Sequence, residues 1–277
     1  MTDFIPIDDP DDPRIAAYRD IRERDLVGRD GHFIAEGEVV LKVLVASARH
    51  RMASLLVVDK RADGLRPLLA GLPGDIPLYR APQAVFDGIA GFPMHRGILA
   101  IGRRQPPPSA DALLARMGPR ALVVLLFGIT NHDNIGGIFR NAAAFGADAV
   151  ILDGQCCDPH YRKAIRVSVG ASLIVPFARL GAGEDAVDLL GRHGFETLSL
   201  SPAGETPLAS LARPPRVAAL FGTEGPGLPA ELLARTQTVA IPMAGGFDSL
   251  NVATTSGIVL HHLAYGTAER PSPSRER

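Results

Sequence analysis

The second half of the chain carries short runs of apolar residues separated by segments with helical spacing. The runs lie at residues 121–127, 149–152, 197–200, 217–221 and 239–241. Runs that are apolar throughout are typical of strands buried on both faces, and intervening helices let successive strands lie parallel. The pattern therefore predicts an α/β domain with a mostly parallel sheet. Ligands of such sheets bind beyond the carboxyl ends of the strands.

A proline run at residues 106–108 interrupts the periodicity upstream of this half. Such a run forms a semi-rigid spacer, so we place a domain boundary there. In the first part, helical patterns at 12–24 and 38–47 and strand patterns at 33–35, 54–58 and 98–101 predict a small α/β sandwich. The predicted organisation is a first domain at 1–104, a linker at 105–117, a second domain at 118–267 and a flexible tail at 268–277.

Charge is nearly balanced, with 29 Lys and Arg against 30 Asp and Glu in 277 residues. No global field therefore attracts a polyanion, and an RNA partner would have to be held by local basic patches. The clusters that could do so are Arg49 with Arg51, Arg103 with Arg104, and Arg162, Lys163 and Arg166. A solvated surface is the ordinary alternative for each cluster.

The two cysteines, Cys156 and Cys157, are adjacent. Their spacing fits neither a zinc site nor a redox pair, so we expect two small hydrophobic side chains, no metal and a reducing cytoplasm. The N-terminus has no basic region followed by an apolar segment, which argues against export. Apolar runs shorter than the ~20 residues of a membrane span predict no membrane association.

The first segment with unusual chemistry covers residues 131–146. Its apolar spacing predicts a helix with Asn134 as the N-cap and Gly146 at the end. Gly136 and Gly137 in the first turn cost ~1 kcal/mol each in helix propensity, which close approach of another backbone or of a ligand would offset. Arg140, in the second turn, is near enough to the N-terminal end to reach a crevice there, although a surface arginine is the simpler interpretation.

The second segment, residues 220–228, is a glycine-rich loop directly after a predicted strand. It is not a phosphate-binding Walker loop, because no Gly-Lys-Ser/Thr follows. It is not the dinucleotide fingerprint either, because its glycines have a different order. Its exposed backbone groups could hold the edges of an adenosine. Glu224 is the carboxylate in its middle.

The third segment, residues 241–257, reads as the end of a strand, a glycine turn and a helix beginning near Ser249. The residues at 254–257 are small and are poor helix formers. Small residues at these positions permit tight packing against another backbone.

The three segments contain, in this order along the chain, the patterns Asn-x-Gly-x-x-x-Arg, Gly-Thr-Glu-Gly-x-Gly-Leu and Ile-Pro-Met-x-Gly-x-x-x-Ser-Leu-Asn-Val. Together they resemble the motifs of the SpoU/TrmH family of RNA ribose 2'-O-methyltransferases, within the SPOUT superfamily. Residues 161–170 also resemble this family. Upstream, residues 33–37 and the helix after them resemble the family's RNA-substrate-binding domain, which shares its α/β sandwich with certain kink-turn-binding ribosomal proteins.

The resemblance implies a deep trefoil knot that binds S-adenosylmethionine and a homodimer with the active site built across its interface. It assigns cofactor contacts to Leu198, Ser199, Gly222, Ile241, Met243 and Leu250. It assigns catalytic positions to Asn134, Arg140, Glu224, Ser249 and Asn251. With the basic clusters, it makes Arg49, Arg51, Arg162, Lys163 and Arg166 the candidate RNA contacts.

By the same resemblance Arg140 binds the phosphate next to the target ribose or acts as the base. Deprotonating an arginine at neutral pH costs about 7–9 kcal/mol, which favours a phosphate clamp and leaves the base role open. Asn134 would hold Arg140 or the ribose, and Glu224 would orient groups of the first motif. Ser249 and Asn251 would orient the methyl acceptor and the cofactor tail. Helix capping and a solvated loop carboxylate are the ordinary alternatives.

Ribosomal RNA is the first expected substrate because of the two-domain layout, and transfer RNA is the second. An RNA- or ribosome-binding protein that has lost the chemistry is a different class of function. A nucleotide-dependent oxidoreductase would need a Gly-x-Gly-x-x-Gly turn followed by an acidic residue, which the chain does not show. His132 and Asp133 stand where many relatives carry a proline, and the near-neutral charge leaves open whether the first domain recruits RNA.

Overall fold

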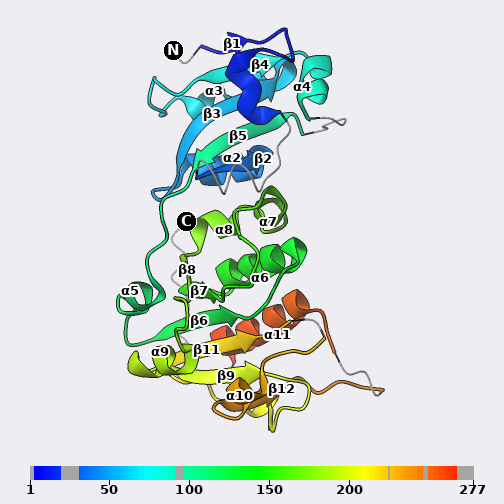
Figure 1. The fold of residues 1–277 in the computed structure, drawn as a ribbon. Coiled ribbons are helices and arrows are strands. Elements are labelled where there is room, and N and C mark those ends of the chain that lie inside the picture. The colour runs from blue at the N-terminus through cyan, green and yellow to red at the C-terminus, as the bar shows by residue number, and fades with distance from the viewer. Residues whose placement is uncertain (1–2, 20–30, 91–95, 224, 246–248, 267–277) are drawn as a thin grey trace. The chain divides into compact units, whose positions relative to one another are not determined.

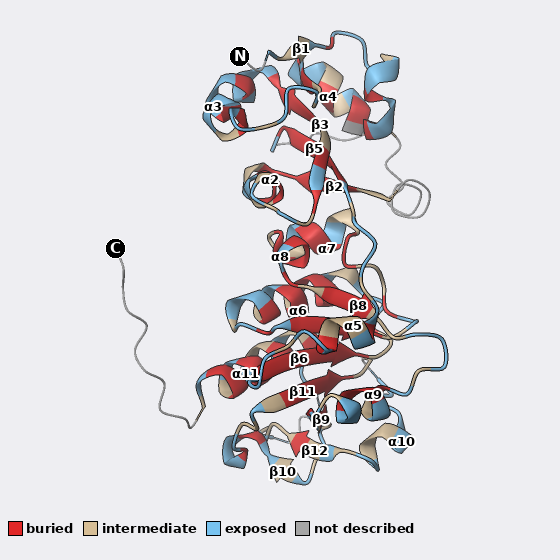
Figure 2. Cartoon of the chain, turned by 90° about the vertical axis from the view of Figure 1, so that its left-hand side faces the viewer, coloured by how far each residue is buried: buried red, intermediate tan, exposed pale blue. Residues whose placement is uncertain are grey.

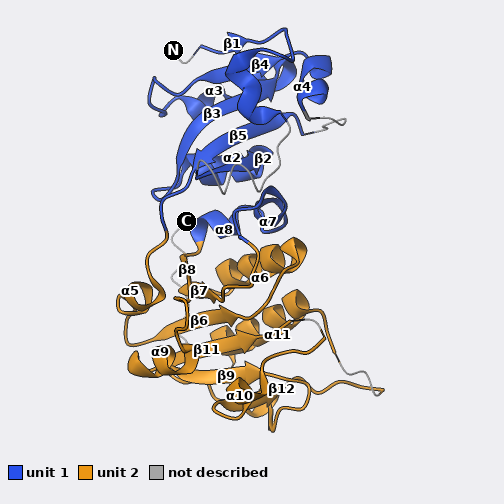
Figure 3. Cartoon of the chain, in the orientation of Figure 1, with its two compact units in different colours: residues 1–106, 158–174 blue, residues 107–157, 175–277 orange. Residues whose placement is uncertain are grey.

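A computed structural model describes residues 3–19, 31–90, 96–223, 225–245 and 249–266 (Figure 1). The chain forms two compact units (Figure 3). Unit 1 comprises Met1–Pro106 and Asp158–Ile174, and unit 2 comprises Pro107–Cys157 and Val175–Arg277. The first division falls inside the predicted linker. In contrast, Asp158–Ile174 belongs to unit 1, although the sequence pattern places these residues in the second domain.

The described residues of unit 1 form a mixed five-stranded sheet in the order β1-β4-β3-β5-β2. Strands β1, β3 and β4 pair in parallel, whereas β5 pairs antiparallel with β3 and β2. The elements are β1 (Ile5–Pro6), η1 (Pro13–Tyr18), β2 (His32–Glu36), α2 (Glu38–Val45), β3 (Arg51–Val58), α3 (Asp59–Leu69), β4 (Leu78–Ala81), α4 (Gln83–Ala90), β5 (Ile98–Arg103), α7 (Arg162–Val167) and α8 (Ala171–Ile174).

Both faces of this sheet are buried. On β3, Leu55 and Val57 belong to one apolar cluster, while Leu56 and Val58 belong to another. Because successive strand residues point to opposite faces, the two clusters lie on opposite sides of the sheet. The first contains residues of α2, α3, α7 and α8, and the second contains residues of η1 and α4. Unit 1 is therefore a layered α/β sandwich.

Residues 158–174 are held in unit 1 by charge and by apolar contact. Asp158 forms an ion pair with Arg104 at 2.8 Å, and both side chains are only 16% exposed. The His160 ring lies 4.9 Å from the His50 ring, centroid to centroid. Burial lowers the pKa of His50 to about 4 and that of His160 to about 3, so both rings are neutral at pH 7. An ionised group buried here would be costly, and the neutral rings pack instead as part of the interior.

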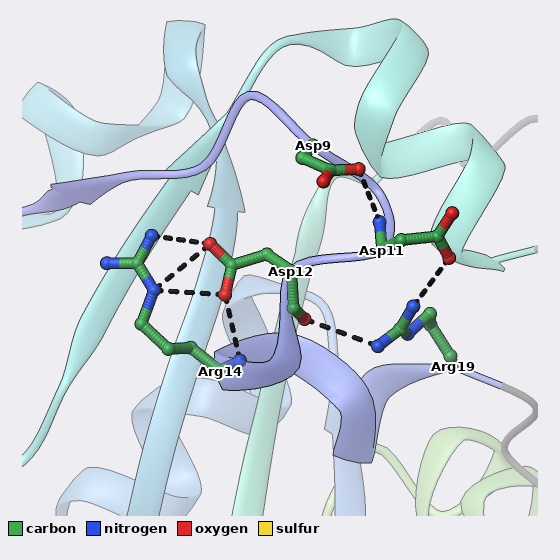
Figure 4. A network of polar contacts seen from close by, with 5 residues as sticks. All are labelled: Asp9, Asp11, Asp12, Arg14 and Arg19. Carbon is green, nitrogen blue, oxygen red and sulfur yellow. Dashed lines mark hydrogen bonds and ion pairs between the residues drawn. The ribbon is translucent and has the colours of Figure 1, made fainter.

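Three aspartates near the N-terminus, Asp9, Asp11 and Asp12, take part in a local network of polar contacts with Arg14 and Arg19 (Figure 4). The Asp12 carboxylate accepts a hydrogen bond from the Arg14 backbone N–H at 2.8 Å and caps η1. Side-chain hydrogen bonds from Arg14 also lower the pKa of Asp12. Arg19 donates to Asp11 at 2.6 Å. The sequence predicts a helix over 12–24, of which η1 is the helical part in the described residues; residues 20–24 lie outside them.

The described residues of unit 2 form a seven-stranded sheet in the order β10-β12-β9-β11-β6-β7-β8, and every recorded pairing in it is parallel. This confirms the predicted α/β fold with a mostly parallel sheet. The elements are α5 (Ala110–Leu114), β6 (Ala121–Leu126), α6 (His132–Ala144), β7 (Ala149–Leu152), β8 (Phe177–Arg179), α9 (Ala186–Arg192), β9 (Glu196–Leu200), β10 (Thr206–Pro207), η2 (Leu208–Ser210), β11 (Arg216–Phe221), α10 (Ala230–Leu233), β12 (Gln237–Ala240) and α11 (Val252–Tyr265).

The apolar runs of the sequence correspond to β6, β7, β9, β11 and β12. Strands β6 and β7 are buried along their whole length, as Figure 2 shows for β6, and this is expected for a sheet covered on both sides. Strands β8 and β10 were not predicted, because they have three and two residues and so carry little periodic signal. Helix α5 lies inside the predicted linker and begins at the Ser109 cap.

The two cysteines differ in burial, and the buried one, Cys156, has an unreactive setting. The Cys156 thiol is buried and donates to the Leu126 carbonyl, and burial raises its pKa to about 12. Cys157 is partly buried. Within the part of the chain that the structure describes, none of the helices combines the length and the apolar character needed to cross a membrane.

Helices α6 and α11 pack unusually closely. A Cβ atom added at Gly137 of α6 would lie 2.7 Å from the Cβ of Ala253 of α11. Nearby, Asn141 of α6 donates to the Ala253 carbonyl at 2.7 Å and to the Ser256 hydroxyl at 3.0 Å. The small residues of the third segment thus meet the glycines of the first, as their propensities predict. Packing between the helices offsets the cost of glycine in α6.

We expect Gly137→Ala to destabilise unit 2 even though alanine favours a helix by about 1 kcal/mol. The added methyl group must push α11 away, and overpacking of this kind costs roughly 1–3 kcal/mol. The measurement is the free energy of unfolding in urea. Gly191→Ala in α9 is the control, because a Cβ there meets nothing within 4 Å, and it should leave stability unchanged or raise it. Equal effects of the two substitutions would contradict the close packing.

Candidate functional site

A cavity of about 410 Å³ lies at the carboxyl ends of β9, β11 and β12. Its walls are glycine backbone and apolar side chains with a few hydroxyl and amide groups. The lining residues are Leu200, Ser201, Pro202, Phe221, Gly222, Thr223, Gly225, Gly227, Val239, Ile241, Met243, Ser249, Leu250, Asn251, Val252 and Thr255. This volume suits a small organic ligand, and the position is where parallel sheets bind their ligands.

The glycine loop after β11 forms one wall of the cavity. A Cβ atom at Gly222 would lie 2.3 Å from the backbone carbon of Gly227, so the loop can fold back on itself only with glycine at this position. Gly225 and Gly227 have φ values of +104° and +72°, a region that side chains disfavour. The glycines therefore set the shape of the wall, which leaves backbone groups of the loop next to the ligand space.

The third segment also lines the cavity and leads into α11. The Asn251 side chain caps this helix by accepting from the backbone N–H groups of Ala253 at 2.9 Å and Thr254 at 3.2 Å. The helix therefore begins at Val252, and the prediction that it begins near Ser249 is wrong. Ser249 and Leu250 precede the helix and line the cavity instead.

A hydrogen bond joins the third segment to the first. The Asn251 amide donates from Nδ2 to Oδ1 of Asn134 at 2.8 Å. Asn134 lies inside α6 and is 5% exposed, while the N-cap of α6 is Asn131, whose side chain accepts from the Asp133 N–H at 2.8 Å. The prediction of Asn134 as the N-cap is therefore wrong. Its buried amide instead fixes the start of α11 against α6.

Arg140 is exposed on α6 and is not among the residues that line the cavity. The structure therefore brings together Asn134, Asn251 and Ser249 around the start of α11, with Arg140 outside this group. Glu224 lies outside the described residues.

Four of the predicted cofactor contacts line the cavity: Gly222, Ile241, Met243 and Leu250. The structure places Leu198 and Ser199 elsewhere. Both lie within β9 between its two neighbouring strands, and the buried Ser199 hydroxyl accepts from Thr236 at 2.7 Å. Leu200 and Ser201 occupy the carboxyl end of the strand and reach the cavity. The predicted strand over 197–200 ends at Leu200, so counting to its last residue would have found Leu200, and Ser201 is the residue that follows.

Thr223 and Thr255 also line the cavity and were not predicted. Each is adjacent to a predicted motif residue or lies one helical turn from one, which is the signal that could have found them. No cluster of three or more His, Cys, Asp or Glu side chains suited to a metal ion occurs in the described ranges.

All five predicted RNA contacts fall in unit 1, because α7 belongs to it. Arg162 and Arg166 lie 3.8 and 4.0 Å from the carboxylate of Glu36, whose side chain is 8% exposed. Arg49 donates to the Ile174 carbonyl at 3.3 Å, and Lys163 and Arg51 are exposed. Two of the five cations thus face a buried carboxylate, which leaves them less free to attract a polyanion.

A family model described as the SpoU rRNA Methylase family matches residues 121–261. The chain is also 40% identical over 276 residues to a protein of Mycobacterium tuberculosis (strain CDC 1551 / Oshkosh) named an uncharacterized tRNA/rRNA methyltransferase. The alignment covers 94% of this chain and 93% of that protein. The chain belongs to the SpoU methylase family. The resemblance found in the three motifs is thereby confirmed.

Solved structures agree with this fold. A crystal structure of an RNA 2'-O ribose methyltransferase is 25% identical, with a TM-score of 0.75, and the match covers 94% of this chain and 98% of that one. The SpoU methyltransferase AviRb from Streptomyces viridochromogenes, solved in complex with AdoMet, is 22% identical with a TM-score of 0.76. That match covers 90% of this chain and 94% of AviRb.

The bond between Asn134 and Asn251 should appear as an energetic coupling in this SpoU family protein. Asn251→Ser keeps a good N-cap but cannot reach Asn134, and Asn134→Ala removes the other partner. We expect the two costs in unfolding free energy to be non-additive by about 0.5–1.5 kcal/mol, the net value of one hydrogen bond.

A control cycle pairs Asn134→Ala with Gln237→Ala, whose amide donates to Thr206 on the neighbouring strand. With no shared partner, these two changes should add to within about 0.5 kcal/mol. Additivity in the first cycle as well would show that the asparagine pair does not link the two helices.

Proposed function

We propose that this protein transfers a methyl group from S-adenosylmethionine to a ribose 2'-hydroxyl in ribosomal RNA. One observation carries the proposal: two motifs far apart in sequence line one cavity, and the remaining motif is hydrogen-bonded to one of them. The glycine loop and the third segment line it, and Asn251 of the third segment bonds Asn134 of the first. As a member of the SpoU family, the chain is an RNA methyltransferase.

The residues of the cavity fit S-adenosylmethionine. Its apolar side chains, such as Leu200, Ile241 and Met243, suit an adenine face, and the glycine backbone at 222–227 offers hydrogen bonds to polar edges. Ser249 and Asn251 also line the cavity, where they would hold the cofactor tail and orient the methyl acceptor. When bound, the cofactor supplies an electrophilic methyl group. AviRb was crystallised with this cofactor, which supports the assignment.

Arg140 would act as a clamp on the phosphate next to the target ribose. A guanidinium binds a phosphate through two parallel hydrogen bonds and fixes the neighbouring hydroxyl in position. Removing a proton from the Arg140 guanidinium would cost about 7–9 kcal/mol at neutral pH. Binding a phosphate does not require this deprotonation, whereas acting as a general base does. Asn134 and Asn251 would position the ribose side of the site, and Glu224 would orient groups of the first motif.

We further propose a homodimer in which Arg140 of one protomer serves the cavity of its partner. The α6–α11 pair, which carries Arg140 on α6, also presents Ile258 and Tyr265 of α11, which are 40% and 52% exposed. The Phe145 ring of α6 contacts the rings of His261 and Tyr265. Exposed apolar surface of this kind is typical of an interface, and a partner there explains why Arg140 lies outside its own cavity lining.

Threading of the chain around the cavity as a deep trefoil knot is part of the same proposal. Strand β12 follows β11 in sequence but pairs with β9, and α11 then returns to α6. This order supports a crossing of the chain next to the glycine loop. Unit 1, an α/β sandwich carrying the basic residues, would be the RNA-binding domain and would share its fold with kink-turn-binding ribosomal proteins.

Mapping of 2'-O-methyl groups tests the function directly. Cells without the gene should lack one or a few ribose methylations in ribosomal RNA, and the wild-type gene should restore them. Loss of a ribose methylation in transfer RNA alone would show that the substrate is transfer RNA and not ribosomal RNA. Unchanged RNA together with binding of purified protein to ribosomal RNA would support a binding protein without activity.

Mixing two inactive variants tests the shared active site. Arg140→Ala should lower methyl transfer by about 100-fold or more while S-adenosylmethionine still binds in calorimetry. Gly222→Val displaces the glycine loop and should abolish cofactor binding. If the sites are shared, a 1:1 mixture of subunits should regain up to about a quarter of wild-type activity, since half the dimers hold one intact site.

Arg120→Ala, an exposed arginine just before β6, is the control and should keep full activity. Simultaneous loss of cofactor binding and activity in Arg140→Ala would make this arginine structural. Failure of the mixture to recover any activity, with heterodimers shown to form, would place Arg140 in the site of its own chain.

A further inference from the structure

The register of the unit 1 sheet brings together three residues that are far apart in sequence. On neighbouring antiparallel strands, Arg51 of β3 lies directly opposite Arg103 of β5, and Arg103 lies directly opposite His32 of β2. Residues paired in this way point to the same face, with Cβ atoms about 4.5–5.5 Å apart. We call these three residues the cationic row. It crosses three strands and ends at the edge strand β2.

Folding alone does not explain the cationic row. Like charges directly opposite each other on a sheet destabilise it. Arg51 and Arg103 are both exposed, and the described residues contain no hydrogen bond or ion pair from either guanidinium. The row lies on the face that carries Ile34 and Ile101, beyond the apolar cluster of that face. A repulsive arrangement that packing does not need is best accounted for by an anionic ligand.

The next residue along the chain shows what a structural arginine looks like here. Arg104 directly follows β5, pairs with Asp158 at 2.8 Å and is 16% exposed. Arg80 of β4 provides a second comparison, because it is exposed but lies opposite Val57 and Pro6 rather than another cation. The juxtaposition of two unpaired arginines is therefore a property of the row and not of every strand arginine.

We propose that the cationic row binds the sugar–phosphate backbone of the substrate RNA, and this inference rests on the proposed function. Guanidinium groups on adjacent strands can each take one phosphate, and the His32 imidazole can donate a hydrogen bond in either protonation state. Backbone contacts of this kind position RNA without reading its sequence. In a chain with a net charge of −1, such a local row would supply attraction that the whole protein lacks.

The test measures binding of ribosomal RNA, purified from cells lacking the gene, to the full-length protein over a range of salt concentrations. Arg51→Gln combined with Arg103→Gln should weaken binding about 25- to 60-fold at 0.1 M salt. It should also reduce the slope of log K against log salt by about 1.4–1.8, the value for two lost phosphate contacts. Arg80→Gln is the matched control and should change affinity by less than about 2-fold.

Stability and cofactor binding separate this role from a structural one. Removing like charges should leave the unfolding midpoint of the double variant at or above that of the wild type, and S-adenosylmethionine should bind unchanged. Unaltered RNA affinity and salt slope in the double variant, or equal weakening by Arg80→Gln, would overturn the proposal. Failure of the wild-type protein to bind S-adenosylmethionine would instead overturn the proposed function. The proposal for the cationic row and the proposed function can therefore fail separately.

Discussion

The contact between α6 and α11 is the constraint on which the site depends. It needs glycine at position 137 because any larger residue would collide with Ala253, and it is fixed by the hydrogen bond from Asn251 to the buried Asn134. Asn251 also caps α11, so one side chain sets both the start of the helix and its attachment to α6. The cavity wall formed by Ser249 and Leu250 leads directly into this cap. A change in the helix contact would therefore move the wall.

Unit 1 is completed by a segment whose neighbours in sequence build unit 2. Residues 158–174 follow β7 and precede β8, yet Ile165 and Leu173 belong to the apolar cluster of the unit 1 sheet. The buried pair of Arg104 and Asp158 adds a charged contact to this packing. The chain thus passes from one unit to the other three times, so three chain segments join the RNA-binding unit and the cofactor-binding unit that we propose.

Much of the site follows from local sequence. The glycines of the loop at 222–227 and the small residues after Asn251 have few uses other than close approach, so their positions already indicate a tight, backbone-lined cavity. The N-cap residue of α6 could not be predicted from local sequence. Asn131 and Asn134 are both good capping residues, and only the presence of α11 beside α6 decides that Asn134 is turned inward.

By itself, the sequence determined the parallel sheet, the order of the motifs and the family, because apolar runs and glycine positions are signals read within a few residues. Tertiary structure decided which unit residues 158–174 complete, that Leu200 and Ser201 rather than Leu198 and Ser199 reach the cavity, and that Arg51, Arg103 and His32 form one row. These features depend on strand register and on packing between segments far apart in the chain. No local pattern encodes such distances.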